Sequence, residues 1–246
     1  MLKIENAETI GWEHAIRGMR NPMNSWEKSD SNLYHASVHF DECNKRWETN
    51  GHRFMIGPND LDLMTRLRNA GTDHRKFMRM ITVYVDLIDP LYWWKEFDTY
   101  KVGTVANSCS TMHKIADKEF TLEDFSCEHL IQDWDDPKRR IGRIIPGTPM
   151  EHLYKTVEYL NRWRERYLVA IKTESETGLP AKDIWWQMIQ LLPSSYNQKR
   201  TVMLNYEVLA NICKSRRNHK LDEWHTFCDW IKTLPYSELI TGEGND

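Results

Sequence analysis

A run of small polar side chains follows a tryptophan pair in the segment LYWWKEFDTYKVGTVANSCSTMHK, residues 91–114. Within it, GTVANSCSTM supplies five hydroxyl or amide side chains, which can exchange hydrogen bonds with a phosphate or a base edge. Gly103 lets the backbone approach a ligand closely. The same residues can equally cap a helix and line a turn. The residues of this segment that we assign to a candidate nucleotide or cofactor site are Tyr100, Lys101, Thr104, Asn107, Ser108 and Ser110.

Two short basic clusters could add phosphate ligands to this segment. Lys199-Arg200 forms one, and Arg216-Arg217 with Lys220 forms the other. Guanidinium and ammonium groups match phosphate oxygens, and clusters this small suit a nucleotide better than a nucleic-acid polymer. The alternative is that they are solvated helix ends. We assign Arg216 and Arg217 to the candidate site.

Histidines and cysteines occur in two arrangements that resemble metal-ligand spacing. On a helix, the four-residue spacing of His35, His39 and Cys43 would align three ligands, but HASVHF alternates as a strand does. A polar helix face explains the second group better. We therefore predict ordinary packing and no metal site. The sequence also contains no G-x-S-x-G elbow, P-loop or G-x-G-x-x-G motif. The second group consists of Cys213, His219, His225 and Cys228.

Composition excludes several classes of protein. The chain has 246 residues and a net charge of −3, which argues against a general nucleic-acid binder. No apolar run reaches the roughly 18–20 residues that span a bilayer, and the first residues contain no apolar signal core. The five cysteines lack a C-x-x-C pair, so we interpret them as reduced thiols. We expect a single cytoplasmic domain over residues 1–246, with no membrane partner.

Strand and helix signals surround the polar segment. PNDLDLMTRLRNAG (58–71) predicts a helix that ends at Gly71. FMRMITVYVDLI (77–88) is rich in β-branched and aromatic residues and predicts a strand. Asp89 as N-cap and Pro90 at the first helical position predict a helix start. The polar segment would then be a helix end or a loop.

The second half of the chain is predicted to be mostly helical. Residues 121–149 form an irregular connection. Thr148 and Glu151 match a capping box that begins a helix to about Lys172, and another helix follows Pro180 and stops near Pro193. NYEVLANICKSRR and LDEWHTFCDWIKTL supply two further amphipathic segments. The predicted fold class is α+β, a small sheet with packed helices and a helical C-terminal half.

Two segments together resemble the flavin-dependent thymidylate synthases, the ThyX family. LMTRLRNAG, MITVYVDLIDP and LYWWKEFDTYKVGTVANSCSTMH follow in the order of the family's first motif region, and LLPSSYNQKRTVMLNYEVLANICKSRR is similar to its second. The resemblance spans roughly residues 35–230. It implies a ThyX-like fold, a flavoprotein with FAD and a pyrimidine nucleotide as ligands, and a homotetramer with ligand sites between subunits.

The chain departs from the family at the residues that grip these ligands. Thr99, Tyr100 and Lys101 stand where the family has Arg-His-Arg, and Glu207 stands opposite a nucleotide-binding arginine. A charge reversal at a phosphate contact turns attraction into repulsion. Of the family's arginines, only the one that matches Arg216 (or Arg217) is kept. The resemblance therefore implies the fold and a nucleotide pocket with a degenerate active site.

Three functions follow as hypotheses. The first is a nucleotide-binding protein that has lost thymidylate synthesis and binds or sequesters a nucleotide or nucleotide-like signal. The second is a divergent enzyme that uses FAD to methylate a pyrimidine nucleotide, with Lys101 and Arg216 at phosphates and Tyr100 or Trp94 near the flavin. The third is an assembly or partner-binding protein without a catalytic role.

Overall fold

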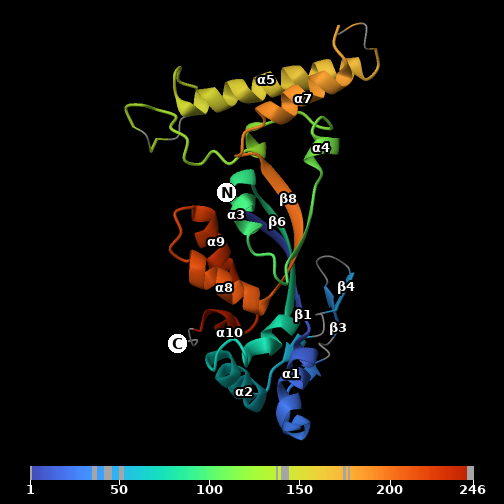
Figure 1. Cartoon of the computed structure of the whole chain (residues 1–246), viewed down its shortest axis with the longest axis vertical. Helices are drawn as coiled ribbons and strands as arrows, with labels where there is room; N and C mark the ends of the chain where they lie inside the picture. Colours follow the sequence, from blue (N-terminus) through green and yellow to red (C-terminus); the bar gives the residue numbers. More distant parts are fainter. Residues whose placement is uncertain are drawn as a thin grey trace.

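The computed structural model describes residues 2–34, 38–41, 46–49, 53–136, 138–139, 144–173, 176 and 178–242. The chain forms an elongated molecule in three tiers, with a helical pair at one end, a sheet in the middle and a group of short helices at the other end (Figure 1). It mixes helices and strands as expected for the predicted α+β class. No helix among the described residues has the length and apolar character needed to cross a membrane.

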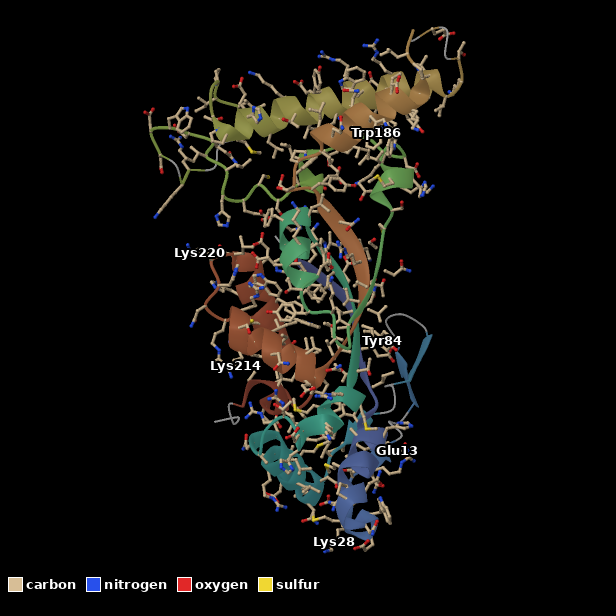
Figure 2. The ribbon with its side chains drawn as sticks, viewed as in Figure 1. Glu13, Lys28, Tyr84, Trp186, Lys214 and Lys220 are labelled. Carbon is tan, nitrogen blue, oxygen red and sulfur yellow. The ribbon has the colours of Figure 1, made fainter. Side chains whose placement is uncertain are left out.

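A four-stranded antiparallel sheet forms the middle tier. Its order is β1 (Lys3–Ile10), β6 (Thr82–Pro90), β8 (Asn197–Asn205) and β7 (Val105–Ser108). Alternation along β6 gives the sheet two different faces, since Val83, Val85 and Leu87 are buried whereas Tyr84 is 39% exposed. Tyr84 lies on the side away from α8 and α9, which cover the buried face (Figure 2).

Helices cover the buried face of the sheet. They are α3 (Leu91–Phe97), α8 (Tyr206–Arg216) and α9 (Asp222–Ile231). The Asn205 side chain caps α8 by accepting a hydrogen bond from the Val208 amide at 3.0 Å, as an N-cap asparagine does. Trp93 and Trp94 of α3 are buried in the main core together with Trp224 of α9. The tryptophan pair is therefore mainly a packing feature.

Short elements, most of them from the first third of the chain, form the lower tier. The helices are α1 (Trp12–Arg20), α2 (Pro58–Asn69) and α10 (Glu238–Thr241), with 3₁₀ turns η1 (Asn21–Met23), η2 (Trp26–Lys28) and η3 (Arg75–Met80). Two small antiparallel ribbons pair β2 (Asn32–Tyr34) with β5 (Arg53–Met55) and β3 (Val38–Asp41) with β4 (Arg46–Thr49). A buried ion pair between Arg20 and Asp60 at 2.6 Å joins α1 to α2.

The upper tier packs α5 (Pro149–Ala170) against α7 (Ala181–Leu191). The Thr148 hydroxyl accepts the Glu151 amide at 3.2 Å, while the Glu151 carboxylate accepts the Gly147 amide at 2.7 Å. The predicted cap is thus present, with its return bond one residue earlier than expected. A second apolar core lies beneath this pair and includes Leu160 and Met188. The connection before it contains η4 (Leu122–Asp124).

Several predicted elements need correction. Asp89 is not an N-cap, because strand β6 continues through Pro90 and pairs Asp89 with Gln198. The predicted strand at residues 77–88 begins only at Thr82, after the 3₁₀ turn η3. The polar segment contains an edge strand, β7, and then the short helix α4 (Thr111–Lys114). The helices predicted at 58–71 and in the second half are confirmed.

Candidate functional site

The loop after α3 is held by the end of that helix and by α8. Amides of Asp98 and Tyr100 donate to carbonyls of Trp94 and Phe97 at 2.9 and 3.0 Å, so the chain turns sharply at the helix end. Gly103 then adopts a φ of +72°. An added Cβ there would lie 2.5 Å from the Asn205 side-chain nitrogen. Only glycine fits this close approach without strain.

A hollow of about 360 Å³ opens beside this loop. Three of the predicted site residues line it, namely Tyr100, Lys101 and Thr104. The remaining lining comes from α3, the strands β7 and β8 and the residue after α3. These residues are Phe97, Asp98, Ala106 and Arg200.

Arg200 also lines the hollow, although the sequence identified it only as part of the basic cluster Lys199-Arg200. Its guanidinium lies 4.2 Å from the centre of the Trp94 ring and pairs with Asp98 at 2.8 Å. It also donates to the Gln198 side-chain oxygen at 3.0 Å. Trp94 is only 1% exposed, so it supports Arg200 from below and does not face a ligand ring. The expectation that Trp94 lies next to a flavin is therefore wrong.

Lys101 and Thr104 carry the uncommitted polar groups of the hollow. Lys101 is exposed and has no acidic partner among the described residues. The Thr104 hydroxyl is buried and has no hydrogen-bond partner in the same part of the chain. A buried hydroxyl without a partner costs free energy, and a ligand in the hollow could satisfy it. With Arg200 and Asp98 cancelling, the formal charge of the lining is +1.

Arg216 lies behind Tyr100 and is not part of the lining. Its Nε donates to the Tyr100 hydroxyl at 2.9 Å, and its other nitrogen pairs with Glu96 at 2.8 Å. Glu96 also accepts the Trp224 indole N–H at 3.1 Å and lies 3.2 Å from His219. Arg216 therefore bridges Glu96 and Tyr100, and its single hydrogen bond to the hydroxyl holds Tyr100 in place.

The other predicted site residues lie elsewhere. Asn107 pairs with Thr201 across the strands and shares the open sheet face, whereas Ser108 pairs with Arg200. The Ser110 hydroxyl caps α4 by accepting the His113 amide at 3.1 Å. Arg217 lines a different hollow. Neighbouring residues on a helix point in different directions, which separates Arg217 from Arg216.

Lys220, the remaining member of that basic cluster, is exposed and points away from the sheet (Figure 2). No group of three or more histidine, cysteine or acidic side chains in the described part of the chain could hold a metal ion. The side chains of His35, His39 and Cys43 lie outside the described residues.

Glu207, which replaces a nucleotide-binding arginine of the resembling family, is held by two arginines of η3. Arg75 pairs with it at 3.2 Å, and Arg79 contacts its other carboxylate oxygen. Burial alone would raise the pKa of Glu207, but the hydrogen bonds and charges of Arg79 and Arg75 outweigh burial and lower it. The three charges sum to +1. The predicted repulsion of a phosphate by Glu207 is therefore cancelled at this position.

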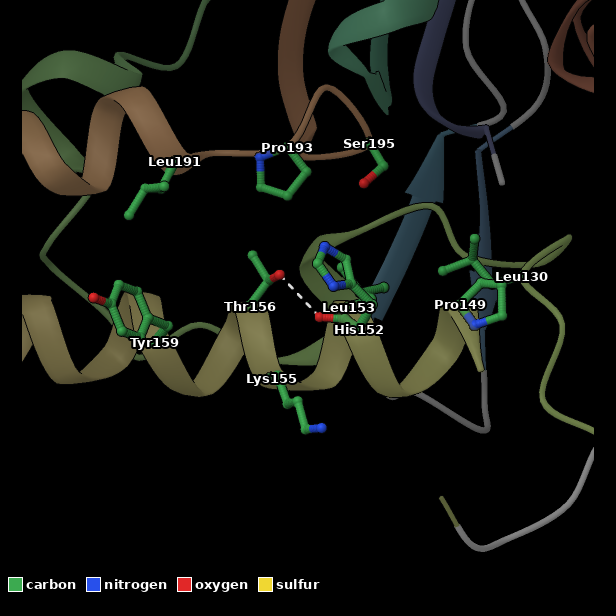
Figure 3. Close-up of a pocket in the computed structure, with 10 residues that line it drawn as sticks. All are labelled: Leu130, Pro149, His152, Leu153, Lys155, Thr156, Tyr159, Leu191, Pro193 and Ser195. Carbon is green, nitrogen blue, oxygen red and sulfur yellow. Dashed lines mark hydrogen bonds between the residues drawn. The ribbon is translucent and has the colours of Figure 1, made fainter. Parts of the chain in front are cut away.

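A larger hollow of about 780 Å³ lies between α5, α7 and the start of β8. Its lining is dominated by aliphatic side chains and two prolines, with His152 and Thr156 on one wall and Ser195 on the other (Figure 3). The one fixed cation, Lys155, is already paired with Glu151 at 2.7 Å. This hollow offers less to a phosphate than the one beside Lys101 does.

The arrangement of the sheet, the helices on one face and the helical pair at one end is that of the flavin-dependent thymidylate synthases. Thymidylate synthase X from Helicobacter pylori, solved with FAD and dUMP, matches at 12% identity and a TM-score of 0.59, over 98% of each chain. A second structure of that enzyme with FAD and dUMP matches at 13% and 0.58, again over 98% of each chain.

A related match is the UMP/dUMP methylase PolB from Streptomyces cacaoi, bound with 5-Br dUMP. It shows 13% identity and a TM-score of 0.54, over 99% of this chain and 96% of that one. No protein-family model and no curated protein sequence matches. The predicted resemblance to the ThyX family is thus confirmed in the fold.

Proposed function

We propose that this protein binds a pyrimidine nucleotide in the hollow beside Lys101 and retains it without thymidylate synthesis. The proposal rests on two groups that line the same hollow of about 360 Å³. One is the exposed ammonium group of Lys101, and the other is the buried hydroxyl of Thr104, which has no hydrogen-bond partner in the described part of the chain. The three similar structures named above were solved with dUMP or its 5-bromo analogue.

The lining suits a phosphate monoester. Lys101 supplies a point charge, and Arg200 supplies planar donors that a phosphate can share with Asp98, 2.8 Å away. Thr104 supplies a hydroxyl that can donate to a phosphate oxygen. Arg216 holds the Tyr100 ring at the rim, where an aromatic face can pack on a base.

The residues do not fit FAD within one copy of this chain. A volume of about 360 Å³ is near the lower end of ligand pockets, which span roughly 300–1,000 Å³, and suits a mononucleotide better than a dinucleotide. Arg216, Arg75 and Arg79 are all engaged by glutamates. We therefore assign no redox step and infer that thymidylate synthesis is lost.

A homotetramer, which the resemblance implies, is part of this proposal. Apolar side chains line up across the open sheet face, where Tyr84, Met203 and Val105 are paired on three adjacent strands. Val105 is 60% exposed and Tyr84 39% exposed. A second copy would cover this row. Light scattering after size exclusion tests the oligomer, and a monomer at all concentrations would refute it.

A ligand panel tests the function. Calorimetry on the wild-type protein compares dUMP, UMP, thymidine monophosphate, deoxyuridine and FAD. We expect a mononucleotide to bind at least about tenfold tighter than deoxyuridine, since the loss of one charge-assisted hydrogen bond costs about 1.5–3 kcal/mol. Binding of none of these compounds would favour an assembly protein. Yellow protein that keeps FAD and converts dUMP would favour the enzyme.

A further inference from the structure

Two opposite charges lie one turn apart on α1 without pairing. Glu13 and Arg17 are both exposed, and an acid four residues before an arginine on a helix normally pairs with it. Asp62 and Arg66 on α2 have the same spacing and do pair, at 2.9 Å. The side chains of Glu13 and Arg17 have no hydrogen bond or ion pair in the described part of the chain. Both charges are therefore available to a ligand.

A hollow of about 550 Å³ opens beside this turn of α1. Glu13 and Arg17 line it together with two aromatic side chains, Trp26 of η2 and Phe54 of β5. Trp26 is 50% exposed, and its indole N–H donates to the Asn21 side-chain oxygen at 2.8 Å, which fixes the ring. The volume lies within the range of roughly 300–1,000 Å³ that is typical of small-molecule sites. The hollow thus combines both charges with a fixed aromatic surface.

The floor of the hollow is a buried network whose members satisfy one another. Arg20 donates its Nε–H to the Asp60 carboxylate at 2.6 Å and its terminal nitrogens to two backbone carbonyls at 3.3 and 3.2 Å. The hydroxyls of Ser29 and Ser31, which line the hollow, donate to the other Asp60 oxygen at 2.7 and 2.6 Å. Since Asp60 neutralises Arg20 and the two rim charges are opposite, the hollow has no net charge.

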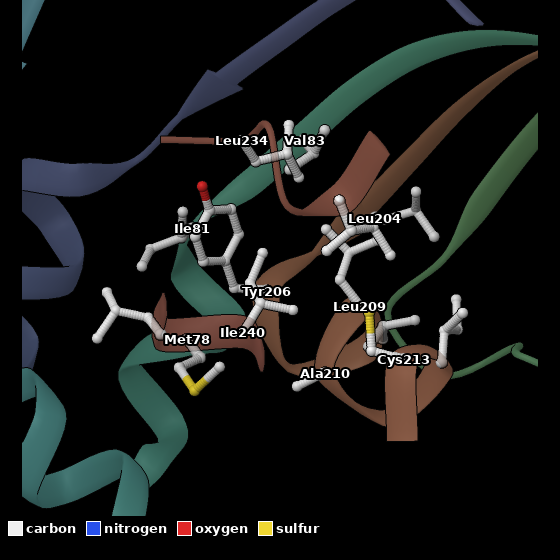
Figure 4. Packing of buried hydrophobic residues seen from close by; sticks show 14 of the residues in the cluster. Met78, Ile81, Val83, Leu204, Tyr206, Leu209, Ala210, Cys213, Leu234 and Ile240 are labelled. Carbon is white, nitrogen blue, oxygen red and sulfur yellow. The ribbon is translucent and has the colours of Figure 1, made fainter. Parts of the chain in front are cut away.

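The main core holds α1 in the orientation that presents these charges. Trp12 of α1 is buried, and its ring makes edge contacts with Tyr206 and Tyr236 at centroid distances of 5.2 and 5.3 Å. Figure 4 shows Tyr206 among the packed apolar side chains of this core. Ile16, one residue before Arg17, is 4% exposed and also lines the hollow. The rim charges therefore stand on a helix that packing fixes in place.

We propose that this hollow binds a free aromatic α-amino acid. The α-carboxylate and α-ammonium groups of such a ligand are both ionised near neutral pH and are attached to the same carbon atom. The carboxylate accepts two hydrogen bonds from the Arg17 guanidinium, and the ammonium donates to the Glu13 carboxylate. The Cβ atoms of residues at this spacing lie roughly 5–6 Å apart, so one zwitterion reaches both. The aromatic body of the ligand packs on Trp26.

Ligands with a single charge match this lining less well. A plain anion at Arg17 is repelled by Glu13, and a plain cation at Glu13 is repelled by Arg17. An uncharged aromatic compound leaves both charges without a partner. The hollow shares no lining residue with the one beside Lys101, so this site is independent of the proposed nucleotide binding.

Calorimetry on the full-length wild-type protein tests the proposal with four compounds. L-phenylalanine carries all three recognised groups. Its amide lacks the carboxylate, hydrocinnamate lacks the ammonium group, and L-alanine lacks the ring. We expect L-phenylalanine to bind and each of the others to bind at least about tenfold more weakly, because each has lost one contact. Equal affinity for hydrocinnamate would show a plain anion site and overturn the proposal, as would no binding of L-phenylalanine at millimolar concentration.

Variants of the two rim residues separate their roles. Arg17→Ala should weaken L-phenylalanine at least about tenfold, and Arg17→Lys should restore part of this loss, since lysine keeps the charge without the planar fork. Glu13→Gln should weaken L-phenylalanine to a similar degree and leave hydrocinnamate no weaker than in the wild type. The matched control is Glu27→Gln, which changes an exposed acid of η2 outside the lining.

Melting temperatures show that each variant is folded, and exposed positions such as these tolerate substitution. Unchanged affinity for L-phenylalanine in both Arg17→Ala and Glu13→Gln would refute the site, as would an equal loss in Glu27→Gln. None of these measurements involves a nucleotide, so their failure is distinguishable from failure of the proposed function.

Discussion

Asp89 is a fully buried acid without a hydrogen-bond partner in the described part of the chain. Burial, with the nearby Glu223 charge acting in the same direction, raises its pKa from 3.8 to about 9. Strand pairing with Gln198 fixes its backbone, so the carboxyl group cannot reach solvent. The folded protein therefore holds Asp89 protonated at neutral pH, whereas the unfolded chain ionises it.

The sign of the pH dependence follows from this difference. A pKa raised in the folded state contributes stability that is complete below pH 3.8 and is lost as the pH rises towards 9. Each pH unit in that window costs about 1.4 kcal/mol. At pH 7, about three units above 3.8, the accumulated loss is about 4 kcal/mol as an upper limit.

Asp89→Asn removes the ionisable group and keeps the side-chain shape. We expect the variant to match the wild type near pH 4 and to become more stable than it as the pH rises, by about 1.4 kcal/mol per unit between pH 5 and pH 8. Urea unfolding at several pH values measures both proteins. Asp62→Asn, which changes a carboxylate that is 65% exposed, is the control and should show no such divergence. If the unfolding free energies of Asp89→Asn and the wild type changed in parallel with pH, Asp89 would not be held protonated in the folded protein.

Two further changes test the loop and the ion cluster. Glu207→Gln should destabilise the protein by about 1–3 kcal/mol, because buried charge-assisted hydrogen bonds are lost. Since the pKa of Glu207 is lowered in the folded protein, the wild type should lose this advantage as the pH falls below 4.5. Equal unfolding free energies of the two proteins in urea at pH 7 would contradict this prediction. Gly103→Ala should cost about 1–3 kcal/mol of unfolding free energy and weaken nucleotide binding, because its Cβ meets Asn205 at φ +72°. Gly178 has a similar φ of +64° but open space around it, so Gly178→Ala adds backbone strain without crowding. Calorimetric melting compares the two variants, and equal losses of unfolding free energy would argue against crowding at Gly103.

Local signals predicted the isolated helices well. Pro58 at the first turn and Gly71 after the last one bounded α2, because these residues act through backbone conformation alone. Asp89-Pro90 carries an equally good local signal for a helix start. Helix α3 does begin there, at Leu91, but its N-cap is Pro90 and not Asp89, because pairing with β8, more than a hundred positions later, extends β6 through Pro90. Sequence reading cannot weigh such a distant partner.

The candidate site was predicted where its residues are contiguous. Tyr100, Lys101 and Thr104 lie within one loop, and the structure brings them together. Arg200 was missed because it joins them through the pairing of β7 with β8, and the exposed sequence VANS has no alternation that predicts a strand. The basic cluster Lys199-Arg200 was its only signal. Asn107 does not line this hollow, because alternate strand residues face opposite sides and Asn107 follows the lining residue Ala106 on β7.

The affinity of one mononucleotide for Lys101→Ala tests the central claim most directly. Lys95→Ala removes the same charge from the exposed face of α3, only six residues away in sequence, and is the matched control. Calorimetry with the tightest mononucleotide of the panel should show Lys101→Ala weakened by about 1.5–3 kcal/mol, or roughly tenfold to a hundredfold, with Lys95→Ala unchanged. Equal affinities for wild type and Lys101→Ala would contradict the assignment of the nucleotide to this hollow.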